Sequence, residues 1–427
     1  MENTTRTIYL DYGAATPLDF RVREAMEPYG DDLFFNPSAA YDEARRVRSD
    51  IEGARASIAH LMGARAGNVV FTAGATEANN LAFTSVRASA KANAGANIKA
   101  STEANTGTNA GASAKVSTKA SAGASTRAST KSPARVLYLA TEHDSVRRVA
   151  EHYGGAPIKV DKSGRIDLAD LKSKITDDTE LISVALVNGE IGVIQPLAEI
   201  SAFLREVKFD RLRRGVRTQL LLHSDASQAL NLLDINVARL GVDLLTLNSA
   251  KIYGPKGVGA LYISHEARLT PEILGGGQEN GLRSGTENVP VVIGFAKAVE
   301  LAHDHLNGNR KKFAELKSLL LKSLQGYELI ATKHQLDNFV NLCYNGIDGE
   351  RLVFLLEEKE IYVATGAACA ASKGEKSHVL RALGLSSDQI TGSLRLTLGA
   401  TNTKDQILTA AKIINEVVAT EKRRLNG

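Results

Sequence analysis

Apolar positions along the chain follow two patterns, one helical and one typical of buried strands. Residues 36–63 carry apolar side chains at steps of three and four residues, and Gly63 follows them. This spacing predicts an amphipathic helix that is capped at Asn36 and stopped by the glycine. The apolar positions of this helix are Ala44, Val47, Ile51, Ala54, Ile58 and Leu61.

Short apolar runs alternate with helical segments along most of the remaining chain. This alternation predicts an α/β protein with a mainly parallel sheet covered by helices, and a site at the carboxyl ends of the strands. Helices near 288–305 and 309–324 then lead into a smaller domain with a strand at 339–343. The earlier predicted strands lie at 68–71, 135–139, 181–187, 218–223, 243–247 and 260–263.

Residues 88–132 interrupt this alternation. They are almost all Ala, Ser, Thr, Gly, Asn and Lys, with Ile98 as the one apolar side chain larger than valine and Glu103 as the one acid. Such a segment cannot bury enough apolar surface to fold alone, so we expect a solvated loop inserted in the large domain. Its basic residues are sparse and no aromatic residues lie between them, which argues against nucleic-acid or membrane binding.

Composition and charge exclude several classes of protein. The 427 residues are enough for a large core and for two or three domains. With 52 basic and 48 acidic residues, the net charge of +4 gives no reason to expect a strongly charged partner. Two cysteines cannot form a disulfide framework, and we find neither a signal-peptide core nor a run of transmembrane length. We therefore expect a soluble, cytoplasmic protein with no nucleic acid or membrane partner.

Two charged residues stand at the ends of neighbouring predicted strands. Lys251 follows the strand at 243–247 and precedes a glycine and proline turn, and Asp225 ends the apolar run that begins at 218. A lysine desolvated among small residues can attack an aldehyde, and a carboxylate can hold the protonated nitrogen of pyridoxal 5′-phosphate (PLP). The ordinary alternatives are a solvated lysine beside a turn and a helix cap at Asp225.

A phosphate-binding pattern follows the strand at 68–71. Gly74 makes a turn, and Ala75 and Thr76 then open a helix. The first turn of a helix offers free backbone N–H groups and a positive dipole end, which suit a phosphate. A simple helix cap is the alternative interpretation.

Several longer motifs occur in a definite order between residue 9 and about residue 403, interrupted only by the insert. They are YLDYGAATPLD, FTAGATEANN, TEH, HSDASQ, KIYGPKGVGALY, GGGQENGLRSGTEN, GAAC and SHVLRALGL. The set resembles the cysteine desulfurases of the NifS and IscS type, within the class V aminotransferases. The resemblance implies a PLP-dependent transferase (aspartate aminotransferase-like) fold. Its large PLP-binding domain would span 18–305, and 1–17 with 306–427 would form a small α+β domain.

The resemblance also implies roles for individual residues. Lys251 would bind PLP covalently, Asp225 would hold the ring nitrogen and Thr76 the phosphate. His143 would stack on the ring and move protons, although a surface or core histidine is the ordinary alternative. Thr286 would reach the cofactor phosphate of a partner subunit, which implies a homodimer. The implied cofactor-binding set is Lys251, Asp225, Gln228, Thr76, Ala75, His143, Asn248, Ser249 and Thr286.

The two cysteines have different surroundings in the sequence. Cys343 lies in an alternating strand pattern and is predicted to be a small core residue. Cys369 lies among small residues with little to pack, so we expect an accessible thiol on a flexible loop, suited to taking sulfur from a bound substrate. Arg395 would grip the substrate carboxylate bidentately, and Asn36 is assigned to the substrate as well. We predict no metal site.

Two positions depart from the family pattern. Ala250 stands beside the lysine where the family has a histidine that helps to hold the phosphate. Gly189 stands where the family has a second asparagine, whose amide donates to the phenolic oxygen of the cofactor. Each lost hydrogen bond to a charged group costs about 1.5–3 kcal/mol if nothing replaces it, so we expect weaker cofactor retention.

These observations predict a PLP-dependent cysteine desulfurase. It would convert L-cysteine to L-alanine and pass sulfur, as a persulfide on Cys369, to an acceptor or Fe–S scaffold protein for cluster assembly or for thio-cofactor and tRNA sulfur delivery. One alternative is a PLP enzyme of the same fold that acts on another amino acid, which the Cys369 loop argues against. The other is a weakened paralogue that acts as a partner-binding scaffold, which Ala250 and Gly189 favour.

Overall fold

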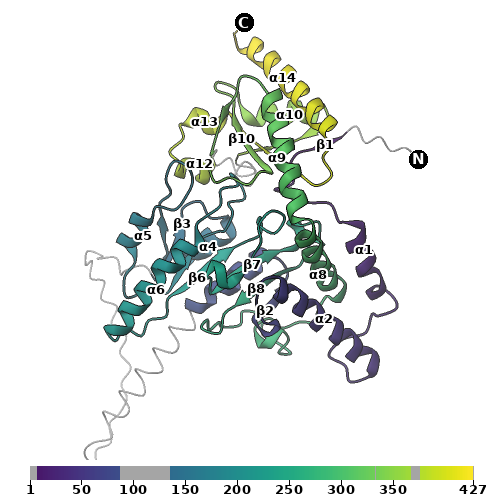
Figure 1. The fold of residues 1–427 in the computed structure, drawn as a ribbon, viewed down its shortest axis with the longest axis vertical. Coiled ribbons are helices and arrows are strands. Elements are labelled where there is room, and N and C mark those ends of the chain that lie inside the picture. The colour runs from purple at the N-terminus through teal and green to yellow at the C-terminus, as the bar shows by residue number, and fades with distance from the viewer. Residues whose placement is uncertain (1–6, 87–134, 332, 367–375, 427) are drawn as a thin grey trace, which may run out of the picture.

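The computed structural model describes residues 7–86, 135–331, 333–366 and 376–426, and its largest sheet has seven strands in the order β2-β8-β7-β6-β5-β3-β4 (Figure 1). Strands β4, β3, β5, β6 and β7 run parallel, and β8 is antiparallel to both of its neighbours. The predicted mainly parallel sheet and α/β class are therefore confirmed. The strands are β2 (Val69–Thr72), β3 (Val136–Leu139), β4 (Ala156–Ile158), β5 (Leu181–Ser183), β6 (Leu221–Asp225), β7 (Leu244–Asn248) and β8 (Gly259–Ile263).

Helices cover both faces of this sheet, because its strands are apolar on both sides. Along β2, Val69 and Phe71 face one cluster of buried side chains, and Val70 faces another. The first cluster includes residues of α2, α5, α6 and α8, and the second includes residues of α4 and of a helix at 75–86. The helices are α1 (Phe20–Met26), α2 (Asp42–Leu61), α4 (Asp144–His152), α5 (Leu168–Lys174), α6 (Leu197–Arg213), α7 (Val237–Leu240) and α8 (Val289–Asp304), with short 3-10 turns at Glu27–Tyr29, Ala66–Asn68, Ser249–Lys251 and Glu279–Gly281.

The first predicted helix starts later than its sequence pattern suggests. Helix α2 begins at Asp42, after Tyr41, so the prediction of a cap at Asn36 was wrong. The side chain of Asn36 instead accepts a hydrogen bond from the Ser38 N–H at 2.9 Å, which closes a local turn. Asparagine before proline favours such a turn over a helix. Most of the predicted apolar face is buried, and Gly63 ends the helix at φ 65°.

The remaining strands form two smaller sheets near the chain termini. Strand β1 pairs in parallel with β11, and β12, β13, β10 and β9 form an antiparallel sheet. Figure 1 shows these strands and helices α9, α10, α12, α13 and α14 grouped at one end of the molecule. The predicted domain boundaries stay a prediction. The elements are β1 (Ile8–Tyr9), α9 (Leu306–Ser323), β9 (Glu328–Leu329), β10 (Phe339–Cys343), α10 (Gly349–Glu357), β11 (Ile361–Tyr362), β12 (Ala364–Thr365), α12 (His378–Ala382), α13 (Ser387–Thr391), β13 (Ser393–Thr397) and α14 (Lys404–Asn426).

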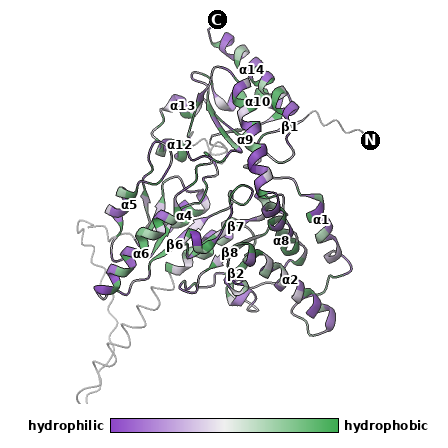
Figure 2. Ribbon diagram, in the orientation of Figure 1, coloured by the Kyte–Doolittle hydropathy of each residue, from purple (hydrophilic) through white to green (hydrophobic). Residues whose placement is uncertain are grey.

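Helix α14 shows how the outer helices are held. Figure 2 shows it banded in hydrophobic and hydrophilic colours, and its buried residues include Ile407, Ile414 and Val418. These positions lie on one face of the helix, which packs against α9 and α10. Within the described part of the chain, none of the helices is both long and apolar enough to span a membrane.

Candidate active site

The predicted lysine and aspartate lie at the carboxyl ends of adjacent strands. Asp225 is the last residue of β6 and pairs with Thr246 of β7, and Lys251 closes the 3-10 turn directly after β7. The start of helix 75–86 lies next to this edge because β8 carries Gly259. A Cβ at that position would lie 2.6 Å from the Leu247 carbonyl oxygen and 2.9 Å from the Gly74 backbone, so only glycine allows this packing. The sheet therefore brings three of the predicted motifs to one edge.

Asp225 is buried and held by two donors. The Asn79 side-chain amide donates to Asp225 Oδ2 at 2.9 Å, and the Ser227 backbone N–H donates to Oδ1 at 2.9 Å. Sequence reasoning missed Asn79, although it lies three residues after Thr76 and thus one helical turn further into the structure. These donors fix the direction of the carboxylate before any ligand is bound.

His143 caps α4 at the same edge of the sheet and is exposed. Its Nδ1 atom accepts a hydrogen bond from the Ser145 backbone N–H at 3.1 Å and lies 2.9 Å from the Ser145 hydroxyl oxygen. That hydroxyl also accepts a hydrogen bond from Asn79 at 2.8 Å. A continuous set of hydrogen bonds therefore connects Asp225 with His143.

A second layer of titratable residues lies beneath Asp225. Glu142 is fully buried and accepts hydrogen bonds from the Ala185 N–H at 2.8 Å and the Ser183 hydroxyl at 3.2 Å. Burial, with a smaller contribution from the charge of Asp225, raises the pKa of Glu142 to about 8. His223 lies 2.8 Å from Ser183 through Nδ1, and burial lowers its pKa. At neutral pH both groups are thus mainly uncharged.

Lys251 points toward the segment that follows β1. Its Nζ atom donates to the Gly13 carbonyl at 2.9 Å and to the Ala14 carbonyl. Gln228, also predicted to contact the cofactor, donates to the same Gly13 carbonyl at 2.9 Å. Three predicted features, the lysine, the glutamine and the YLDYGAATPLD motif, therefore meet at one place.

The residues assigned to the phosphate differ in orientation. Ala75 and Thr76 occupy the first turn of helix 75–86, and Thr76 is exposed. Asn248 caps the 3-10 turn by accepting from the Ala250 N–H at 3.2 Å. The Ser249 side chain is fully buried beside Gly254, since a Cβ on that glycine would lie 2.1 Å from the Ser249 hydroxyl. Ser249 therefore packs into the protein, and Thr76 and Asn248 remain the better candidates.

Arg395 stands on β13 and is almost fully buried. It forms an ion pair with Asp11 at 2.7 Å and donates to the Gly189 carbonyl at 3.1 Å. Its Nε atom is buried and has no partner among the described residues. An anionic group in this region would thus meet an arginine that is already oriented. Asn36 lies on an exposed loop, and its predicted role in substrate binding stays a prediction.

The loop that carries Thr286 is anchored by a buried ion pair that sequence reasoning missed. Arg55 of α2 contacts Glu279 through two hydrogen bonds of 2.6 and 2.9 Å, and Glu279 also accepts from the Phe71 N–H. Burial lowers the pKa of Arg55, but the hydrogen bonds and charge of Glu279 outweigh it and raise that pKa above its usual value. The available signal was a charged residue between Ile51 and Ile58 on the apolar face of α2. Thr286 itself is exposed.

Of the two cysteines, the structure describes Cys343. Cys343 lies on β10 and is buried, as predicted, and burial raises the pKa of its thiol to about 11. Cys369 lies outside the described residues, as does the whole insert at 88–132. Ser377 and His378, which follow the loop of Cys369, contact Glu190 and the Glu142 carbonyl respectively. Ser377 and His378 therefore lie beside the candidate site.

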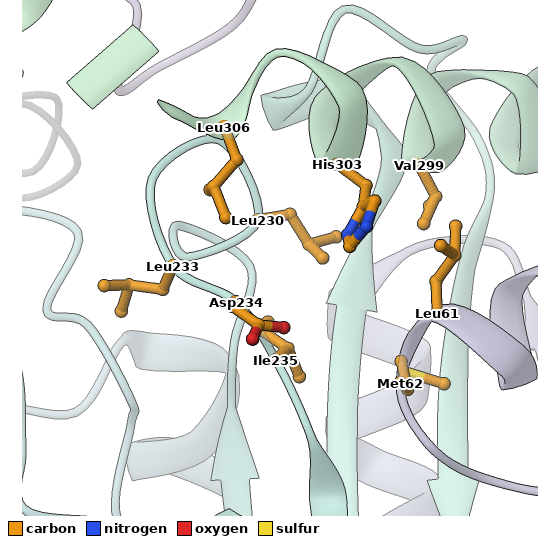
Figure 3. Close-up of a pocket in the computed structure, with 9 residues that line it drawn as sticks. All are labelled: Leu61, Met62, Leu230, Leu233, Asp234, Ile235, Val299, His303 and Leu306. Carbon is orange, nitrogen blue, oxygen red and sulfur yellow. The ribbon is translucent and has the colours of Figure 1, made fainter. Parts of the chain in front are cut away.

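A small void lies apart from this site and shares no residue with it. Figure 3 shows the void between α8, the end of α2 and the segment at 230–235. Its volume is about 10 Å³, which is room for roughly one water molecule. The void is therefore a minor packing feature and has no part in the chemistry.

Comparison with known proteins decides the family. The family model described as Aminotransferase class-V matches residues 8–116 and 110–409. The chain belongs to this family. The cysteine desulfurase IscS 1 of Archaeoglobus fulgidus is 36% identical over 419 residues, which cover 96% of each chain. The cysteine desulfurase IscS of Dictyoglomus turgidum is 34% identical and covers 97% of this chain and 95% of its own. The predicted membership in the NifS and IscS group is thus confirmed.

Solved structures agree with this assignment. One described as a NifS-like protein has a TM-score of 0.78 at 27% identity and covers 97% of this chain and 100% of its own. Another, described as SspA in complex with cysteine, has a TM-score of 0.70 at 28% identity and covers 92% of this chain and 99% of its own. The predicted fold is confirmed, and this group of the class-V aminotransferases consists of PLP-dependent enzymes.

The residues present fit PLP. A buried carboxylate for the ring nitrogen and a lysine for the aldehyde lie at the ends of adjacent strands. The start of helix 75–86 offers backbone N–H groups for the phosphate, and His143 is exposed at the same edge. At the two positions that depart from the family, Ala250 is half-buried, and a Cβ on Gly189 would lie 3.4 Å from Gln228 Nε2. That distance is an ordinary contact, so Gln228 occupies the space that an asparagine at 189 would face.

Proposed function

We propose that this chain is a cysteine desulfurase that uses PLP, releases L-alanine from L-cysteine and holds the sulfur as a persulfide on Cys369. The observation that carries the proposal is the placement of Asp225 and Lys251 at the ends of adjacent parallel strands, in a chain with full-length similarity to proteins named cysteine desulfurase. The free thiols that this chemistry needs suit a reducing compartment, so we place the protein in the cytoplasm.

PLP, when bound, supplies a ring that accepts electrons from the Cα atom of the substrate. Asp225 holds the proton on the ring nitrogen, since its carboxylate is buried and already directed by Asn79 and Ser227. Thr76 and the first turn of helix 75–86 hold the phosphate. Lys251 must give up its hydrogen bonds to the Gly13 and Ala14 carbonyls to bind the cofactor.

The substrate is held and deprotonated by residues of the same edge. Arg395 binds the carboxylate of L-cysteine. Its guanidinium is buried, and its Nε–H has no hydrogen-bond partner among the described residues. The Lys251 amine would take the proton from Cα. His143 stands at the mouth of the site and moves a second proton.

Sulfur transfer is a nucleophilic displacement at the substrate sulfur. The Cys369 thiolate forms a bond to that sulfur, and the substrate Cβ–S bond breaks with its electron pair left on carbon. The carbon takes up a proton, so L-cysteine and the enzyme thiol become L-alanine and an enzyme persulfide without any external oxidant. An acceptor or Fe–S scaffold protein then removes the sulfur.

A pair of cysteine variants tests this proposal. Cys369→Ala should retain the visible absorption of bound PLP but form no persulfide and deliver no sulfur. Cys343→Ala is the matched control. It should form the persulfide and deliver sulfur, because Cys343 is buried on β10. Persulfide found by mass spectrometry on Cys343 would contradict the assignment.

A lysine variant separates the enzyme from a scaffold that has lost its chemistry. The wild-type protein should show visible absorption from PLP and release alanine from L-cysteine, and Lys251→Ala should lose both. A wild-type protein with neither property would favour the scaffold. Alanine formation only from another amino acid would favour a different PLP enzyme.

We also propose a homodimer in which Thr286 of one subunit reaches the phosphate bound by the other. Thr286 is exposed, and the Arg55 and Glu279 ion pair fixes the base of its loop. Sedimentation should give twice the mass of one chain. A monomeric wild-type protein, or a Thr286→Ala variant that binds PLP as tightly as the wild type, would refute the shared site.

A further inference from the structure

Asn79 connects the carboxylate of the candidate site with a serine at the start of α4. Its amide nitrogen donates to Asp225 Oδ2 at 2.9 Å and to Ser145 Oγ at 2.8 Å, and its side chain is fully buried. The carboxylate fixes the direction of this amide, because the reverse orientation would place two acceptor oxygens against each other. Asn79 is therefore a donor to Ser145.

Ser145 connects Asn79 with His143 by hydrogen bonds. Its hydroxyl oxygen accepts from Asn79, so its own hydrogen can point to His143 Nδ1, 2.9 Å away. The Ser145 backbone N–H donates to the same Nδ1 atom at 3.1 Å. Two donors thus face Nδ1, and the ring proton of neutral His143 must lie on Nε2.

We propose that Ser145 and Asn79 are positioning residues that fix the tautomer and ring orientation of His143 and connect it to Asp225. The inference rests on the proposed function for the role of His143 in proton transfer. The hydrogen-bond set itself belongs to the protein without cofactor. It makes Nε2 the atom of His143 that carries a proton, and a ring flip would break both contacts at Nδ1.

Nitrogen-15 NMR of the cofactor-free protein tests the proposal directly. The ring resonances of His143 are assigned by their absence in His143→Gln. In the wild-type protein they should show Nδ1 without a proton and Nε2 with one. Ser145→Ala should shift the Nδ1 resonance and raise the fraction of the other tautomer by roughly two- to tenfold, because one of two donors is lost. A proton on Nδ1 in the wild type, or an Nδ1 resonance unmoved in Ser145→Ala, would overturn the proposal.

Two further variants serve as controls. Ser145→Thr keeps the hydroxyl and should restore the wild-type resonances. Ser224→Ala removes another buried serine hydroxyl, which has no partner among the described residues, and should leave His143 unchanged. Should Ser145→Ala fail to fold, the wild-type tautomer and the Ser145→Thr variant still decide the question.

Kinetics adds a readout that a purely structural role would not give. Ser145→Ala should lower kcat for alanine formation by roughly two- to tenfold with little change in KM, and Ser145→Thr should recover it. An equal loss in Ser145→Thr would contradict positioning by the hydroxyl. If the wild-type protein forms no alanine, the proposed function fails, whereas the NMR result still decides the positioning of His143.

Discussion

The two sides of the candidate site are built differently. The ring side, which we define as Asn79, His143, Ser145 and Asp225, is joined by hydrogen bonds of 2.8–3.1 Å within one chain. The phosphate side, which we define as Thr76, Asn248 and Thr286, consists of two exposed threonines and an asparagine whose oxygen already caps a turn. One side is organised in advance, and the other depends on what binds there.

This difference follows from what each side must recognise. A ring nitrogen and an imidazole need protons at single, defined atoms, so their partners have to be fixed. A phosphate accepts hydrogen bonds from several directions and is stabilised by the positive end of a helix, so backbone N–H groups can replace a lost side chain. The departure at Ala250 therefore falls where the chemistry tolerates substitution best.

Removal of the charge on the ring side should give the largest effect. Asp225→Asn keeps the shape of the side chain but cannot hold the ring nitrogen in its protonated form. We expect kcat for alanine formation to fall by about 10²–10³-fold, as for other groups that stabilise developing charge. Ser224→Ala, on the same strand, should change kcat less than twofold or so. A loss below about tenfold in Asp225→Asn would mean that the ring side is not the fixed part of the site.

Restoration of the family residues at positions 250 and 189 should have an intermediate effect. Equilibrium dialysis would give the PLP dissociation constants of the wild type, Ala250→His, Gly189→Asn and the double variant. The double variant should bind about ten- to a hundredfold more tightly, because each 1.4 kcal/mol is a factor of ten. The space at Gly189 admits a Cβ at ordinary distance from Gln228.

Equal PLP dissociation constants in all four proteins would have a different meaning. They would show that Gln228 and Asn248 already replace the missing groups, and the scaffold alternative would lose its main support. A single Ala250→His change should gain less than the double, since Asn248 stands next to it on the same turn.

A third effect is on stability and concerns the buried layer beneath the ring side. The pKa of Glu142 is about 8 in the folded protein against an ordinary value of 4.5. Between these two pH values, the folded state therefore holds a proton that the unfolded state has lost. Stability should therefore fall as pH rises from about 5 to 8, by up to about 1.4 kcal/mol per pH unit from this group. Glu142→Gln should remove that slope.

Urea unfolding of the cofactor-free protein at several pH values between about 5 and 8 measures this difference. The wild type and Glu142→Gln share all other titrating groups, so the difference between their slopes isolates Glu142. Parallel curves would show that Glu142 is ionised in the folded protein.

The sequence predicted the strands and the ends at which chemistry occurs more accurately than it predicted the supporting contacts. Apolar runs located β2, β3 and β6 to β8 within a few residues, and Asp225 and Lys251 lie at the ends of adjacent strands. Asn79 and Ser145 were missed because their contacts join distant parts of the chain. Asn79 lies 146 residues before Asp225 and 66 residues before Ser145. Such contacts depend on the register of distant strands and leave no local periodic signal.

The error at Asn36 has a different cause. Cap and turn share the same residue types, and the choice between them depends on a single local hydrogen bond. Arg55 shows the opposite case: a charge on an apolar helix face was visible in the sequence, but its partner Glu279 was not.

The pairing of β1 with β11 also dictates an order of events during biosynthesis. Ile8 finds its partner only when Ile361 has left the ribosome, roughly tens of seconds later at ordinary rates of synthesis. Until then the segment with Gly13 and Ala14 has no strand to hold it in place over Lys251. Lys251 is therefore not covered by this segment from its own synthesis until Ile361 has emerged.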